Sequence, residues 1–224
     1  MQDSIVPANK WLNYSAYLFD MDGTLVNSEP LKGKALAQAC EHYGTKVEDK
    51  IYQTVMGQNW PTVTQHFFNH AQIAPNLAEF NQIFKEHYQY LLTHQLKETK
   101  GSFVLLNHLK EEGKKIAVVS SAAGWMVKQI LAQLELDDFF DITISLEDVT
   151  QHKPHPEAYL LALEKLKIEA NDTLVFEDSY AGITAGDQAG CDVIAVKHEF
   201  NMNNDLSLAK FCISDFSELL RQES

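Results

Sequence analysis

An apolar run that ends in two acids lies near the beginning of the chain. Residues 16–19 (AYLF) are followed by Asp20 and Asp22, and then by Gly23 and Thr24. Carboxylates at the end of a buried strand cost desolvation free energy unless a cation or hydrogen bonds meet them. Ligands of open α/β sheets bind at the carboxyl ends of the strands, where these acids would lie. The segment therefore predicts a strand that delivers acids to a site, followed by a sharp turn at the glycine.

Short apolar runs recur between helical patterns along the rest of the chain. Strands are expected at 14–20, 115–119, 141–145, 173–176, 192–196 and 211–214. Strands that alternate with helices at these lengths favour parallel pairing, in a sheet that helices cover on both faces. The sequence therefore predicts an α/β fold with a parallel sheet.

A helical block interrupts this alternation between the first and second expected strands. Its helical patterns cover residues 48–57, 61–72 and 76–94, and a helix is also expected to begin near Pro30 with Ser28 as a possible cap. We interpret the block as an inserted second domain. The expected boundaries are 28–96 for the all-helical insertion, and 1–27 with 97–224 for the α/β core.

Composition limits the partners and the compartment. The 224 residues carry a net charge of −13 without a cluster of Lys or Arg, which argues against nucleic acid and anionic membranes as partners. Cys40, Cys191 and Cys212 form no CxxC motif, and an odd number favours reduced thiols in a cytosol. No signal peptide or apolar run of about 18 residues is found. We expect a cytoplasmic protein, and a monomer because no apolar surface stripe stands out.

Polar residues follow three further expected strands. Ser120 and Ser121 follow the second strand, Lys153 comes just after the third, and Glu177 and Asp178 follow the fourth. Because parallel strands bring their carboxyl ends to one edge of a sheet, these residues are expected to converge with the acids of the first strand.

Such a set of residues suits phosphate chemistry. Asp20, Glu177 and Asp178 offer the hard oxygen ligands that Mg²⁺ prefers, and a metal would offset the repulsion between crowded carboxylates. Lys153 and the hydroxyl of Ser120 could meet phosphate oxygens. One carboxylate could attack phosphorus to form an aspartyl-phosphate, while a second acts as acid and base.

Four segments together resemble the four motifs of the haloacid dehalogenase superfamily. They are DMDGTL at 20–25, Ser120 at the end of IAVVS, Lys153 in HKPHPE, and FEDSYAGITAG at 176–186. They occur in the family's order, at similar spacing, and span about residues 14–196. The resemblance implies a Rossmann-like core, with the helical insertion acting as a cap that closes over substrate and excludes water.

The resemblance also implies roles for the residues of these motifs. Asp20 would be the nucleophile and a Mg²⁺ ligand. Asp22 would be the general acid and base, and would bind the metal through its backbone carbonyl. Ser120 would bind phosphate through its hydroxyl, Lys153 would neutralise the phosphoryl oxygens and Asp20, and Asp178 would be a second protein ligand of the metal.

Further residues are implied to support these roles or to contact substrate. Thr24 would hold the turn, Ser121 would donate a backbone N–H to phosphate, and Glu177 would bind the metal directly or through water. Glu29 could reach substrate, or could simply favour the start of the next helix through the helix dipole. Trp60 is a candidate for a specificity loop of the cap.

Differences within the superfamily narrow the expected chemistry. True haloacid dehalogenases lack the second Asp of the first motif and need no metal, so Asp22 indicates phosphate chemistry. Relatives of β-phosphoglucomutase have a His a few residues beyond this motif and an Arg in a cap loop, whereas this chain has Lys32 near the first position and no Arg at 56–60. The segment VNSEPL is more similar to sugar-phosphate phosphatases, which usually have Asp in place of Asn27. Many relatives also have Gly in place of His152.

These features predict an enzyme, a Mg²⁺-dependent phosphatase that hydrolyses a small phosphomonoester. Sugar phosphates are the first expected substrates, followed by phosphoglycolate and by nucleotide or cofactor phosphates. A phosphomutase, which would return the phosphoryl group to a sugar, is the alternative. A catalytically idle binding protein on the same fold is a third possibility, against which the intact acids, Ser and Lys argue.

Overall fold

The computed structural model describes residues 11–220, and these divide into two compact units. One unit comprises the residues up to Val26 and those from Glu98 onward, and the other comprises Asn27–Lys97. The first unit contains all the strands of the sheet, whereas the second contains helices alone. Among the described residues, no helix combines the length and apolar character needed to cross a membrane.

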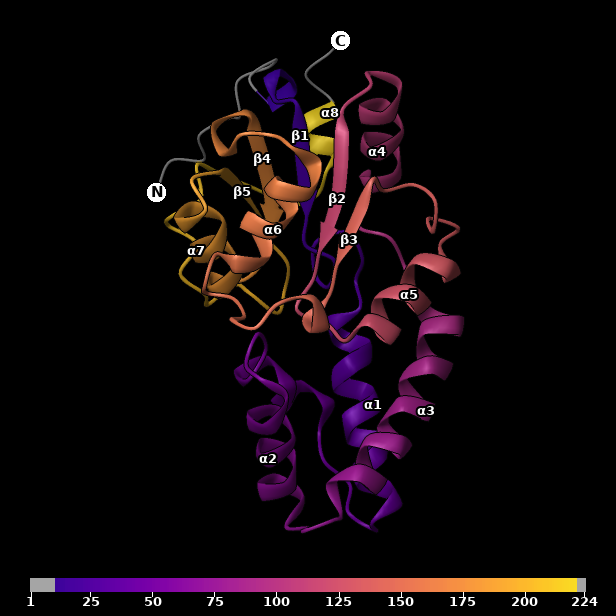
Figure 1. The fold of residues 1–224 in the computed structure, drawn as a ribbon. Coiled ribbons are helices and arrows are strands. Elements are labelled where there is room, and N and C mark those ends of the chain that lie inside the picture. Colours follow the sequence, from indigo (N-terminus) through magenta and orange to yellow (C-terminus); the bar gives the residue numbers. More distant parts are fainter. Residues whose placement is uncertain (1–10, 221–224) are drawn as a thin grey trace. The chain divides into compact units, whose positions relative to one another are not determined.

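The α/β unit is built on a six-stranded parallel sheet (Figure 1). Its strands are β1 (Ala16–Phe19), β2 (Lys115–Val119), β3 (Ile142–Ile144), β4 (Thr173–Glu177), β5 (Asp192–Val196) and β6 (Phe211–Ile213). Their order is β3-β2-β1-β4-β5-β6, so β1 lies between β2 and β4. In this register Phe19 is opposite Val118 on one side and Phe176 on the other. The predicted parallel α/β sheet is confirmed.

Helices pack against both faces of this sheet. They are α4 (Ser102–Glu111), α5 (Gly124–Gln133), α6 (Glu157–Leu166), α7 (Tyr180–Gln188) and α8 (Ser217–Leu220), with 3₁₀ turns at Trp11–Asn13, Leu146–Asp148 and Ala170–Asp172. On one face, Leu18 and Val175 pack in a core cluster with residues of α6 and α7. On the other, the rings of Phe19 and Phe176 stack with centroids 4.9 Å apart, beside Phe216 just before α8.

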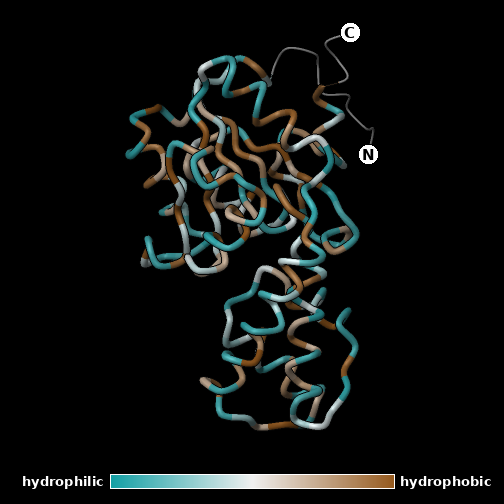
Figure 2. The backbone as a smooth tube through the Cα atoms, turned by 90° about the vertical axis from the view of Figure 1, so that its right-hand side faces the viewer, coloured by the Kyte–Doolittle hydropathy of each residue, from teal (hydrophilic) through white to brown (hydrophobic). Residues whose placement is uncertain are grey.

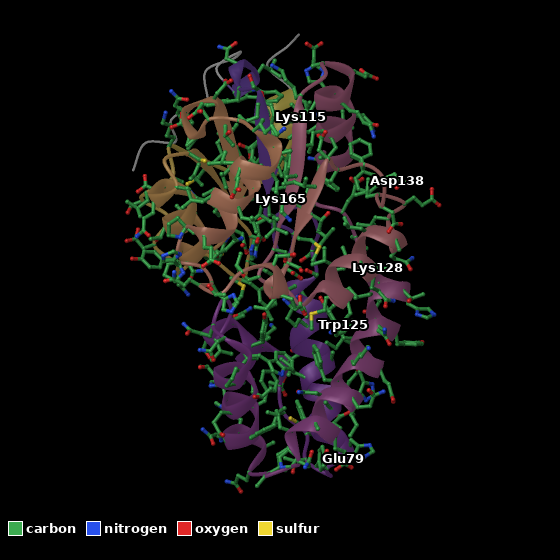
Figure 3. The ribbon with its side chains drawn as sticks, in the orientation of Figure 1. Glu79, Lys115, Trp125, Lys128, Asp138 and Lys165 are labelled. Carbon is green, nitrogen blue, oxygen red and sulfur yellow. The ribbon has the colours of Figure 1, made fainter. Side chains whose placement is uncertain are left out.

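Hydrophobic residues fill the centre of the α/β unit, where much of the tube is brown in Figure 2. All four residues of β1 are completely buried, because a parallel strand between two neighbours is covered on both faces. Charged side chains lie outside this core, such as the exposed Lys128, Asp138 and Lys165 labelled in Figure 3. The acids that are buried in this unit must therefore be stabilised by specific partners, because burial of a charge costs desolvation free energy.

The helical unit contains α1 (Glu29–His42), a 3₁₀ segment (Asp49–Thr54), α2 (Trp60–Ala71) and α3 (Leu77–Gln95). Asn59 and Asn76 cap α2 and α3, since each side chain accepts a hydrogen bond from a backbone N–H of the first turn. Aromatic rings form the interior, with Phe68 against Phe80 at a centroid distance of 4.7 Å.

Two local expectations for this unit were wrong. The expected helix at 48–57 is only the 3₁₀ segment, and the chain turns at Gly57 with φ +78°. Ser28 occupies the N-cap position of α1, but its side chain makes no capping hydrogen bond; Pro30 lies in the first turn as expected.

Candidate active site

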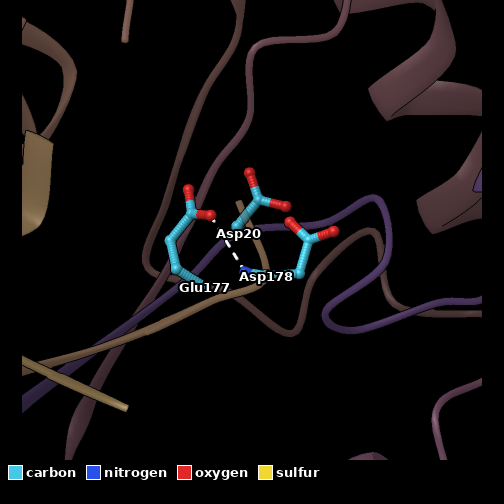
Figure 4. Close-up of side chains that lie close together, drawn as sticks. All are labelled: Asp20, Glu177 and Asp178. Carbon is cyan, nitrogen blue, oxygen red and sulfur yellow. Dashed lines mark hydrogen bonds between the residues drawn. The ribbon is translucent and has the colours of Figure 1, made fainter. Parts of the chain in front are cut away.

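Three acids meet at the carboxyl ends of β1 and β4. Asp20 follows β1 and donates its backbone N–H to the carbonyl of Phe176 at 2.9 Å, while Glu177 ends β4 and Asp178 follows it. Each offers a carboxylate oxygen, and these oxygens lie within 4.8 Å of one another (Figure 4). All three residues are buried. The parallel pairing of the two strands brings the acids together, as the sequence predicted.

Lys153 provides the positive charge of this cluster. Its Nζ donates to Asp20 Oδ1 at 2.8 Å, to Glu177 Oε1 at 2.6 Å and to the carbonyl of Val119 at 2.8 Å. Only 5% of the Lys153 side chain is exposed. The lysine therefore joins the nucleophile candidate to β4 and to the end of β2, as expected from its place after β3.

Both oxygens of Glu177 are engaged by protein donors. Oε1 accepts from Lys153 and from the hydroxyl of Tyr159 at 2.9 Å. Oε2 accepts from the amides of Asp178 at 3.0 Å and Ser179 at 3.1 Å, and from the hydroxyl of Ser179 at 3.1 Å. A carboxylate held by this many donors serves first as an anchor for Lys153 and for the beginning of α7. Binding of a metal by Glu177, directly or through water, remains a prediction.

The electrostatics of the cluster show a shortage of positive charge. Burial raises the pKa of Asp20 well above its usual range, the ammonium of Lys153 opposes this, and the charges of Glu177 and Asp178 add to the rise. Burial alone would lower the pKa of Lys153, but Asp20 and Glu177 outweigh it and hold that pKa above its ordinary value. Three buried carboxylates facing one ammonium fit a bound dication, and their oxygens are donors of the kind that Mg²⁺ takes.

Ser120 and Ser121 lie at the same edge, directly after β2. Ser120 is buried, and its backbone N–H donates to the carbonyl of Ile144 at 2.9 Å. Its Oγ accepts a hydrogen bond from the backbone N–H of Ala122 at 3.0 Å. With the oxygen accepting, the hydroxyl proton can donate to a phosphate oxygen. Ser121 is exposed. Their contacts with phosphate remain predictions.

The turn after β1 contains Asp22, Gly23 and Thr24, and its glycine packs against Asp178, since an added Cβ would lie 2.3 Å from Asp178 Oδ2. Gly23 adopts φ +79° and donates its N–H to Val26 at 2.8 Å, which closes the turn. Asp22 is buried but is not among the three acids whose oxygens lie together. The Oγ1 of the fully buried Thr24 has no hydrogen-bond partner among the residues described. The roles expected for Asp22 and Thr24 remain predictions.

Comparison with known proteins adds to this geometry. Residues 17–196 match the model of the haloacid dehalogenase-like hydrolases. The chain belongs to this family. It is 30% identical over 187 residues to the phosphorylated carbohydrates phosphatase of Thermotoga maritima, covering 83% of this chain and 87% of that protein. It is 32% identical over 182 residues to hexitol phosphatase A of Escherichia coli, covering 80% and 82%.

The fold of this haloacid dehalogenase-like hydrolase is also similar to solved structures. CbbY from Rhodobacter sphaeroides, solved in complex with phosphate, superposes with a TM-score of 0.82 at 23% identity, over 92% of this chain and 96% of that chain. At this identity the likeness shows the fold alone.

Three residues that lie outside the four motifs and contact the acidic cluster of this hydrolase were missed in the sequence. Tyr159 was not singled out, yet its hydroxyl reaches Glu177, and burial with the charges of Glu177 and Asp20 raises its pKa, which keeps it a donor. His198 and Asn201, in the loop after β5, both bond to Asp178. The only signal for the last two was their position after a strand of the same parallel sheet.

The two expected substrate residues of the helical unit make contacts within that unit. Glu29 begins α1, accepts from Lys32 at 3.3 Å on Oε1, and has no partner for its buried Oε2 within the described part of the chain. Trp60 begins α2 rather than lying in a loop, and its indole N–H donates to Asn81 at 2.9 Å. Contact of Glu29 or Trp60 with substrate remains a prediction.

Proposed function

We propose that this protein is a Mg²⁺-dependent phosphatase that hydrolyses a small phosphomonoester, with phosphorylated sugars or sugar alcohols as the first substrates to test. The observation that carries the proposal is the ion pair between Lys153 Nζ and Asp20 Oδ1 at 2.8 Å, inside a buried cluster of acids. The names of two relatives, a phosphorylated carbohydrates phosphatase and a hexitol phosphatase, support the substrate class.

The proposed metal site uses Asp20 and Asp178, the backbone carbonyl of Asp22, and Glu177 through water. When bound, Mg²⁺ would supply positive charge that offsets the crowded carboxylates and the phosphoryl oxygens. The buried acids in excess of Lys153 support a dication in this place.

In the proposed reaction, an Asp20 carboxylate oxygen forms a bond to phosphorus while the ester P–O bond breaks. Asp22, in its protonated form, gives its proton to the leaving alkoxide. The resulting carboxylate then takes a proton from water, whose oxygen attacks phosphorus. The bond between phosphorus and Asp20 breaks, which releases inorganic phosphate and restores both acids.

Other residues would hold the phosphoryl group during these steps. Lys153 would bind its oxygens by charge and would keep Asp20 in place. Ser120 would donate its hydroxyl proton and Ser121 its backbone N–H to other oxygens. Preorganised donors of this kind stabilise the charge that develops in the transition state.

We also propose that the protein works in the cytoplasm, as a monomer. Cys40, Cys191 and Cys212 are free thiols, and free thiols persist most readily in a reducing compartment.

The test is phosphate release from a panel of metabolite phosphates, with and without Mg²⁺, for the wild type and for Asp20→Asn. We expect Mg²⁺-dependent release that the substitution abolishes. Isomerised sugar phosphate in place of inorganic phosphate would identify a phosphomutase instead. A folded wild type that releases no phosphate and forms no isomer would point to a binding protein.

A further inference from the structure

The loop after β5 holds Asp178 at two of its atoms. His198 Nε2 lies 2.8 Å from Asp178 Oδ2, and Asn201 Nδ2 donates to the backbone carbonyl of Asp178 at 2.8 Å. Asn201 is fully buried, and 20% of the His198 side chain is exposed. Both the side chain and the main chain of Asp178 are thus fixed by residues of a neighbouring strand's loop.

The second ring nitrogen determines which way the hydrogen bond of His198 runs. The backbone N–H of Phe200 donates to His198 Nδ1 at 3.2 Å, so Nδ1 acts as an acceptor. In this tautomer the ring proton is on Nε2, which donates to the carboxylate of Asp178. His198 therefore acts on Asp178 as an oriented hydrogen-bond donor.

Asn201 fixes the place of His198. Its Oδ1 accepts the backbone N–H of His198 at 2.9 Å, and its Nδ2 also donates to the carbonyl of Val196 at 2.8 Å. One buried amide therefore connects the end of β5, the main chain of His198 and the main chain of Asp178. Hydrogen bonds in such a buried network are held firmly, because each unsatisfied group would cost desolvation free energy.

Gly23, in the turn after β1, packs against the Asp178 carboxylate on another side. A Cβ added to Gly23 would lie 2.3 Å from Asp178 Oδ2 and 2.9 Å from His198 Nε2. The glycine backbone is thus packed directly against this hydrogen bond. Together, His198 and the turn at Gly23 restrict rotation of the carboxylate.

We propose that His198 and Asn201 form a clamp that positions Asp178 for Mg²⁺. The proposal rests on the proposed function only in taking Asp178 as a metal ligand. Hydrogen bonds to a ligating group orient it before the metal arrives, and removal of such a partner typically weakens metal affinity by about 10–100-fold. His198 is a positioning residue, since it acts through Asp178.

The test compares two substitutions of similar size that differ in one property. In His198→Gln the side-chain amide can still donate to Asp178, whereas in His198→Met no donor remains. Isothermal titration calorimetry with Mg²⁺ alone, on the full chain without substrate, gives the dissociation constant of each variant. We expect the constant to rise by about 10–100-fold in His198→Met and to stay within about threefold of the wild type in His198→Gln. With substrate, the Mg²⁺ concentration for half-maximal rate should rise while kcat at saturating Mg²⁺ changes little.

Two controls separate a local effect from a general one. His94→Ala removes a histidine whose Nδ1 bonds to the carbonyl of Tyr90 one helical turn earlier, at 2.7 Å, and it should leave Mg²⁺ affinity unchanged. Thermal unfolding of each variant shows whether it is folded. Equal affinity in folded His198→Met and His198→Gln would overturn the clamp while leaving the metal site in place. A wild type that binds no Mg²⁺ would overturn the metal site, and the clamp with it.

Discussion

Glu177 and Gly182 lie so close together that no side-chain carbon fits between them. A Cβ added to Gly182 would lie 1.7 Å from Glu177 Oε1 and 2.2 Å from Oε2. The carboxylate cannot move away without loosening its hydrogen bonds to Lys153 and Tyr159. The glycine is therefore required by the site, although glycine inside a helix usually costs about 1 kcal/mol relative to alanine.

Gly182→Ala should accordingly destabilise the protein, by about 1–3 kcal/mol as for other overpacked positions, and should also reduce phosphatase activity. Gly186→Ala is the matched control in α7, because its Cβ would meet Val193 at 2.9 Å rather than Glu177. That variant should lose stability but keep kcat. Urea unfolding and phosphate release measure both effects, and an active Gly182→Ala would contradict the anchoring role of Glu177.

Asp20→Asn should reduce turnover by about 10⁴-fold or more, the scale seen when a nucleophile is removed. The neutral amide keeps the shape of the side chain but cannot attack phosphorus. The fold should survive, because one charge fewer relieves repulsion from Glu177 and Asp178. Phosphate release with circular dichroism checks both points. A stable variant with a near-wild-type rate would remove Asp20 from the role of nucleophile.

Tyr159→Phe should lower both the stability and the kcat of the protein. The substitution keeps the ring, whose centroid lies 4.9 Å from Lys153 Nζ, but deletes the hydrogen bond to Glu177. A hydrogen bond to a charged group contributes about 1.5–3 kcal/mol to stability, so a loss of that size in the free energy of unfolding is expected. The kcat should also fall, because Glu177 then holds Lys153 less firmly. Tyr17→Phe is the control, since its buried hydroxyl donates to the carbonyl of Trp11 at 2.8 Å. Steady-state kinetics should show an effect in the first variant alone.

Asp141 lies at the amino end of β2, away from the site, and allows a test of how the stability of the protein depends on pH. Burial alone would raise the pKa of Asp141, but its hydrogen bonds with Lys115 (labelled in Figure 3) at 2.8 Å and with the N–H of Ile116 at 2.9 Å hold that pKa below its ordinary value of 3.8. A group with a depressed folded pKa stabilises the protein above its unfolded pKa, and this stabilisation is lost as the pH falls through the folded value.

Asp141→Asn should therefore have a lower melting temperature than the wild type at pH 7. The difference should shrink as the pH falls from about 4, where the wild-type carboxyl in the unfolded chain begins to bind its proton. Melting curves between pH 2 and pH 7 measure this. A difference that stayed constant over the whole range would show that the carboxylate charge contributes nothing.

The sequence predicted correctly the positions of those site residues that directly follow a strand. Asp20, Glu177 and Asp178 each follow or end an apolar run. A parallel sheet places the carboxyl ends of all its strands at the same edge. The same logic placed Lys153 among them. For these residues, the prediction needed only the pairing rule and the apolar patterns.

The residues that were missed depend on tertiary contacts without a local pattern. Tyr159 lies on the buried face of α6, where an aromatic ring is expected for packing alone, and the partner of its hydroxyl comes from a different strand. His198 and Asn201 lie in an irregular loop, and their partners are the carboxylate and the backbone carbonyl of Asp178, 20 and 23 residues earlier. The sequence likewise does not predict that both carboxylate oxygens of Glu177 accept hydrogen bonds, because their donors come from several separate segments of the chain.

The distance in sequence between Lys153 and Asp20 has a consequence for how the protein is made. The two residues are 133 positions apart, so β1 leaves the ribosome long before its neighbours β2 and β4 and before the lysine that balances its acid. Domains of such non-local topology fold slowly and expose unpaired strands on the way. A nascent chain that stops before residue 153 can neither complete the sheet around β1 nor neutralise Asp20. The cluster around Asp20 can therefore assemble only after β4, which carries Glu177, has been synthesised.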